Sequence, residues 1–110
     1  MYNGIAQSVA VKVADDLVGI YNKVFGTLAL GDCAILDRSL RDVAALANRE
    51  FDACGALTES RRQMLSDALS ELVTARGAAD GRDLINMTSA LRRTAGRINA
   101  LVVDVMTNLE

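Results

Sequence analysis

The chain has 110 residues, of which 51% are hydrophobic, 24% charged and 4% aromatic, and its net charge is −2. This length suits a single domain over residues 1–110, and the apolar content argues against intrinsic disorder. Because the chain has no histidine and only two cysteines, we expect no metal site, no other cofactor and no enzymatic activity.

Four segments of the chain show the periodicity of amphipathic helices. Apolar residues recur every three or four positions, no stretch alternates with the two-residue period of a strand, and no proline interrupts the pattern. We predict helices over about residues 5–30, 32–54, 58–76 and 82–109. Short breaks between helices require antiparallel neighbours, so the sequence predicts an all-α, antiparallel four-helix bundle with up-down-up-down topology.

The first predicted helix has the widest apolar face. When its residues are placed at 100° intervals, the apolar arc covers about 200°, whereas one core contact needs a stripe of about 100°. This helix must therefore contact more than one neighbour, either within the fold or across an interface between chains. Gly26 leaves open whether the helix is straight or broken near its end. We predict the interface at Val9, Val11, Val13, Leu17, Val18, Tyr21 and Phe25.

The second predicted helix follows a break at residues 31 and 32. Asp32 is expected to cap its first turn, and Gly55 is expected to end it in a left-handed conformation. Its outer face carries oppositely charged pairs four residues apart, such as Asp37 with Arg41. Pairs of this kind contribute only about 0.2–0.5 kcal/mol each, so we interpret this face as a solvated surface.

Candidate reactive side chains are few. Cys33 and Cys54 lie on one predicted helix roughly 30 Å apart, which excludes a disulfide between them. Cys33 falls in the first turn, where the helix dipole lowers a thiol pKa, and its role stays open between a reactive thiol and an apolar packing residue. Glu50 lies at the edge of the apolar arc, where pairing with Arg61 is favoured over catalysis.

The third and fourth predicted helices are separated by the loosest stretch of the chain, residues 77–81. Thr58 is the expected N-cap of the third helix, and Asp80 or Asp83 would open the fourth. Apolar residues of the fourth helix follow a heptad rhythm, which is typical of close helix packing. Its polar face carries three arginines, Arg92, Arg93 and Arg97.

Three classes of function remain. We favour a non-enzymatic protein–protein interaction module, such as an adaptor, small chaperone or assembly component, acting through the first helix as a homodimer or with another helical protein. The alternative is a helical nucleic-acid-binding regulator that uses the three arginines, although the net negative charge disfavours nucleic acid as a partner. A small-molecule carrier or enzyme would need a cavity with convergent polar groups. With no signal peptide or membrane span in the sequence, we expect a cytoplasmic protein.

Overall fold

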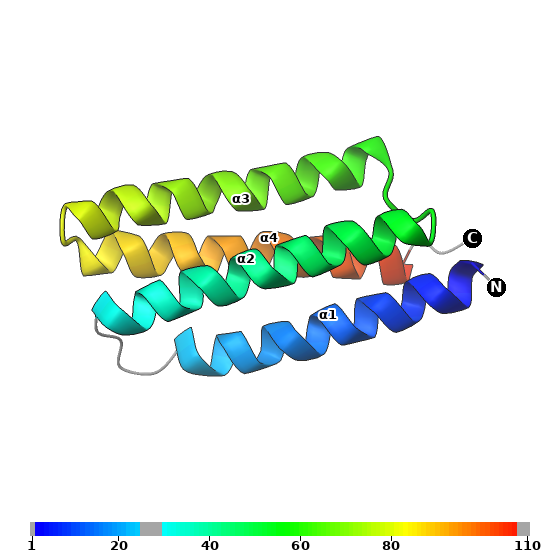
Figure 1. Ribbon diagram of the computed structural model, residues 1–110, viewed down its shortest axis with the longest axis horizontal. Coiled ribbons are helices and arrows are strands. Elements are labelled where there is room, and N and C mark those ends of the chain that lie inside the picture. Colours follow the sequence, from blue (N-terminus) through cyan, green and yellow to red (C-terminus); the bar gives the residue numbers. More distant parts are fainter. Residues whose placement is uncertain (1, 25–29, 108–110) are drawn as a thin grey trace.

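The computed structural model describes residues 2–24 and 30–107, which form four helices and confirm the predicted helical bundle (Figure 1). The helices are α1 (Tyr2–Val24), α2 (Leu30–Ala53), α3 (Glu59–Asp80) and α4 (Leu84–Thr107). Figure 1 shows that successive helices run in alternating directions, so the start of α1 and the end of α4 lie at the same end of the bundle.

The helices are not packed equally against one another. The most extensive contact joins α3 and α4, followed by α1 with α4 and α1 with α2, whereas α2 contacts α3 less closely. Within the described residues α1 and α3 are not neighbours, whereas α2 and α4 each contact all three other helices, and α4 has the most extensive contacts of the four. The result is an elongated and flattened bundle, with extents of 46 × 24 × 19 Å.

Small and medium-sized aliphatic side chains fill the core. Val13, Leu40, Leu72 and Ile98, one from each helix, have no exposed surface, and Phe51 is the largest fully buried side chain. Short side chains allow helix backbones to approach closely at small crossing angles. Each helix accordingly also buries a fully covered alanine: Ala10, Ala47, Ala68 and Ala95.

Three predicted helix ends are confirmed by their capping geometry. Gly55 follows α2 with a φ of 75°, the left-handed conformation that glycine adopts without steric cost. Thr58 caps α3, because its side-chain oxygen accepts a hydrogen bond from the Arg61 amide at 3.2 Å. Asp83 precedes α4, and its Oδ1 accepts a hydrogen bond from the Asn86 amide at 3.1 Å.

The end of α3 differs from the prediction. The stretch predicted to be loose, residues 77–81, is helical as far as Asp80. Alanine strongly favours the helix, and Ala78 and Ala79 pack, partly buried, against the core, so the two glycines that flank this stretch do not break the helix before its end. The reversal into α4 is correspondingly short, and Arg82 within it adopts a φ of 56°.

The beginnings of the first two helices also differ. α1 starts at Tyr2, three residues earlier than predicted, and α2 starts at Leu30. Asp32 therefore lies inside the first turn of α2 and is not its cap, although a carboxylate there still complements the positive end of the helix dipole. Gly26, at which the sequence left a break open, lies outside the described residues.

Candidate functional site

The predicted interface on α1 divides into two groups of residues. Val9, Val13 and Leu17 are buried in the chain's own core, so in this fold they are not available to a partner. Val11 and Val18, by contrast, are 45% and 57% exposed. The wide apolar arc thus combines a core stripe with a separate outer stripe. Tyr21 belongs to α1, and Phe25 lies outside the described residues.

Val11 and Val18 lie on the same side of α1. They are seven residues apart, which corresponds to about two turns, so their side chains project in nearly the same direction. We refer to these two residues as the outer valine strip. The neighbouring helix α4 exposes Val103 and Met106 near its end, which is the end of the bundle where α1 begins (Figure 1).

Two of the three arginines of α4 lie close to acidic side chains of α3. Arg92, Arg93 and Arg97 are all exposed. Nε of Arg93 donates a hydrogen bond to the Glu71 carboxylate, and Arg97 lines a small hollow together with Asp67. Nearby carboxylates reduce the positive potential that a phosphate backbone would need. The geometry therefore adds no support for nucleic-acid binding by this face.

Arg61 pairs with a different residue from the one predicted. Its Nε donates to Asp104 Oδ2 on α4 at 2.8 Å, and its Nη1 donates to the Ala56 carbonyl at 2.7 Å. Glu50 instead lies 4.0 Å from the guanidinium of its neighbour Arg49. The prediction was wrong because it chose the arginine nearest in the sequence, whereas the Arg61 side chain faces α4, the helix against which α3 mainly packs.

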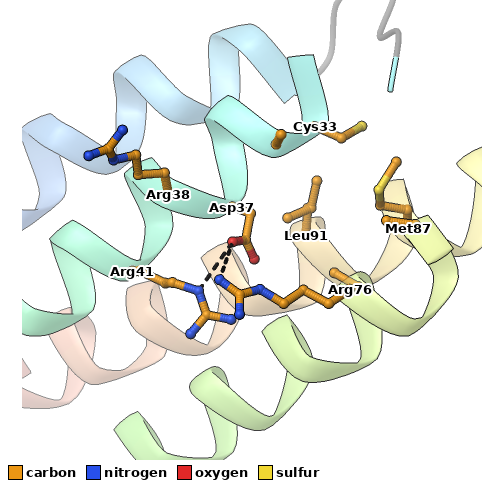
Figure 2. A pocket seen from close by; sticks show the side chains of 10 residues that line it. Cys33, Asp37, Arg38, Arg41, Arg76, Met87 and Leu91 are labelled. Atoms are coloured by element: carbon orange, nitrogen blue, oxygen red, sulfur yellow. Dashed lines mark hydrogen bonds and ion pairs between the residues drawn. The ribbon is translucent and has the colours of Figure 1, made fainter. Parts of the chain in front are cut away.

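A pocket of about 440 Å³ opens between α2, α3 and α4 (Figure 2). Its volume falls within the usual range of about 300–1,000 Å³ for small-molecule sites. Alanines line the pocket on both α2 and α3, and their short side chains leave the space unfilled. It is lined by Cys33, Ala34, Asp37, Arg38 and Arg41 of α2, by Ala75, Arg76 and Ala79 of α3, and by Met87 and Leu91 of α4.

A charged cluster joins two helices at this pocket. Asp37 Oδ2 accepts a hydrogen bond from Arg41 Nε at 3.1 Å and lies 3.5 Å from Arg76 Nη2. Figure 2 shows the two guanidinium groups side by side, both joined to Asp37 by dashed lines, while Arg38 points away from them. Asp37 Oδ1 is buried and accepts no hydrogen bond from the described residues. The same carboxylate oxygen, Oδ2, thus contacts both arginines.

The sequence predicts one of the two ion pairs in this cluster. The spacing of Asp37 and Arg41 predicts their pairing, which is confirmed, but the pair is not simply a solvated surface because the Asp37 side chain is only 15% exposed. Arg76 joins it from 39 residues further along the chain. This contact depends on the axial register of α2 against α3, for which the sequence carries no local signal.

Cys33 forms part of the apolar wall of the same pocket. Burial raises the pKa of its thiol, a hydrogen bond with Thr88 opposes this shift, and the charge of Asp32 adds to it. The pKa of this thiol is therefore raised and not lowered as expected, because its removal from water is the largest effect on it. Both cysteines are free, and Cys54 Sγ donates to the Phe51 carbonyl at 3.5 Å.

We also searched the described part of the chain for membrane-spanning helices and for metal-binding clusters. None of its helices is long and apolar enough to cross a membrane, and no three side chains of the metal-binding types gather at one place. Comparison with known protein families, with curated proteins and with solved structures found no match for this chain.

Proposed function

We propose that this protein is a non-enzymatic helical interaction module, an adaptor, small chaperone or assembly component, that forms a homodimer through the outer valine strip of α1. One observation carries the proposal: Val11 and Val18 are exposed on a helix that already fills its core stripe with other residues. The fold of the single chain does not use these two side chains. A partner that covered them would therefore gain apolar contact without disturbing the core.

A second copy of the same chain suits this strip geometrically. In a symmetric dimer the same patch lies on both subunits, so two copies of α1 would face each other. Apolar residues seven positions apart repeat along one seam of a helix pair, as in coiled coils. Burying a valine fully contributes roughly 1.5–3 kcal/mol, and a symmetric dimer would bury the pair twice.

The neighbouring helix α4 also exposes apolar residues. Val103 and Met106 belong to a helix that packs against α1, and they lie at the end of the bundle where α1 begins. We also retain a cytoplasmic location as part of the proposal.

The experiment replaces each strip residue by an aspartate. Val11→Asp and Val18→Asp should convert the dimer to a monomer, because a desolvated carboxylate at the seam opposes association. Val73→Asp is the matched control, since Val73 is 67% exposed on α3, which does not contact α1 in the described structure. Sedimentation equilibrium measures the oligomeric state, and circular dichroism checks that each variant stays helical.

Two results would contradict the proposal. A wild-type chain that remains monomeric up to millimolar concentration has no self-association to explain. Equal loss of the dimer in Val73→Asp and Val18→Asp would indicate a general effect of added charge and no specific interface on α1.

A further inference from the structure

The pocket between α2, α3 and α4 combines an apolar wall with a basic edge. Met87 and Leu91 of α4 are buried at its inner side, together with the uncharged thiol of Cys33. Arginines from two different helices lie at its polar side, where Arg41 and Arg76 meet at Asp37 (Figure 2). A site with these two sides fits a molecule that itself has an apolar part and a charged end.

The charges at the pocket favour an anion. Three arginines line it against the single carboxylate of Asp37, so positive charge is in excess. A guanidinium group has five N–H donors, and the contact with Asp37 engages one nitrogen each of Arg41 and Arg76. Further donors on both groups are thus able to bind a carboxylate in the bidentate manner that arginine favours.

We propose that this pocket binds an aliphatic carboxylate of medium chain length, with its carboxylate on Arg41 and Arg76 and its alkyl chain against Met87 and Leu91. Asp37 would act as a positioning residue, because it holds both guanidinium groups at the polar side of the pocket. The site lies on α2, α3 and α4, whereas the proposed dimer surface lies on α1. Each proposal can therefore fail without the other.

The lining selects against other classes of ligand. Among the described residues the lining includes no aromatic side chain, so these residues offer no stacking partner to a nucleotide base or other flat ring. A small polar anion would leave the apolar wall uncovered, and a cationic amphiphile would meet the excess of arginines. Burial raises the pKa of the Cys33 thiol, which keeps this part of the wall neutral at physiological pH.

The methionines of the chain provide a local test. The protein is labelled with ¹³C at the methionine methyl groups and titrated with decanoate, and chemical shifts are recorded by NMR. The Met87 methyl should shift, because Met87 lines the pocket. Met64 and Met106 do not line it and should shift little. Decyltrimethylammonium, which has the same chain and the opposite charge, should bind at least about tenfold more weakly, and acetate should not saturate the site.

Variants locate the binding groups. Arg76→Gln should weaken decanoate binding about tenfold by removing a charge-assisted contact. Arg62→Gln is the matched control, because Arg62 also joins α3 to α2, through Asp52 at 2.8 Å, but does not line the pocket. Ala34→Phe places a large side chain at an exposed lining position and should abolish binding without loss of helicity.

Several outcomes would overturn the proposal. An absence of saturable shifts at Met87 would mean that the pocket does not bind this class of ligand. Equal affinity for decanoate and decyltrimethylammonium would indicate unspecific apolar contact. Shifts at Met106 as large as those at Met87, or equal weakening in Arg62→Gln and Arg76→Gln, would place binding elsewhere on the molecule.

Discussion

Two neighbouring arginines at the start of α3 show how position on a helix decides the role of a charge. Consecutive residues point about 100° apart, so Arg61 faces α4 and is buried, while Arg62 remains exposed. Both make an ion pair with an N–O distance of 2.8 Å, Arg61 with Asp104 and Arg62 with Asp52. Their burial differs, and so should their contribution to stability.

Removing the partner of the buried arginine should therefore cost more. We expect Asp104→Ala to lower the free energy of unfolding by about 2–3 kcal/mol, because it leaves a buried guanidinium without its carboxylate. Asp52→Ala removes an exposed pair and should cost at most about 1 kcal/mol. Urea denaturation followed by circular dichroism measures both. Equal losses in the two variants would show that burial of Arg61 does not set the strength of its ion pair.

Cys33 provides a second prediction at this scale. Burial raises the pKa of its thiol above the ordinary value of 9.0, so the folded state holds this proton more tightly than the unfolded state does. This contribution to stability is present at neutral pH and is lost as the pH rises above that ordinary value. Cys33→Ala has no such proton and should lose less stability than the wild type between about pH 7 and about pH 10. Urea titrations at each pH measure the difference, and parallel curves for the two proteins would contradict it.

At the scale of the element, α3 shows where local signals and tertiary packing disagree. Two glycines within five residues predict a loop, yet Gly77 is helical because the alanines that follow it contact the core. Gly55, in contrast, ends its helix as predicted, with a positive φ. A glycine in sequence marks a possible break, and packing decides whether the break is used.

Gly77 and Gly55 should respond in opposite ways when each is replaced by alanine. A Cβ atom added at Gly77 meets nothing within 4 Å, so Gly77→Ala should raise the free energy of unfolding by about 0.5–1 kcal/mol. Gly55→Ala should lower it by about 1–2 kcal/mol, because the left-handed conformation strains any residue with a Cβ atom. Thermal unfolding monitored by circular dichroism gives both signs. A destabilised Gly77→Ala would indicate that this segment is a loop, as the sequence alone suggested.

At the scale of the whole molecule, periodicity was sufficient for the number and order of the helices but not for how they pair. The apolar stripes repeat every three or four residues in all four segments, so the bundle follows from the sequence. Which helices contact most depends on side-chain volumes summed over whole faces. Three features depend on that pairing: Arg61 bonds to Asp104, Val11 is exposed while Val13 is buried, and Arg76 approaches Asp37.

The two candidate sites were predictable to different degrees, because one lies on a single helix and the other depends on how three helices pair. Val11 and Val18 were among the predicted interface residues, since an unusually wide apolar face is visible in one helix. The pocket was not predicted, because it arises where small side chains of α2 and α3 meet at a particular register. A run of alanines beside charged residues is compatible with close packing as well as with a hollow.

The central position of α4 has a consequence for the order in which the protein is made. This helix contacts each of the other three, yet it is the last of them to leave the ribosome. Until then α1 and α3 lack the helix against which each of them packs most extensively. Much of the cooperative folding therefore waits until α4 has emerged, and the nascent chain passes through a stage in which its first three helices need protection from aggregation.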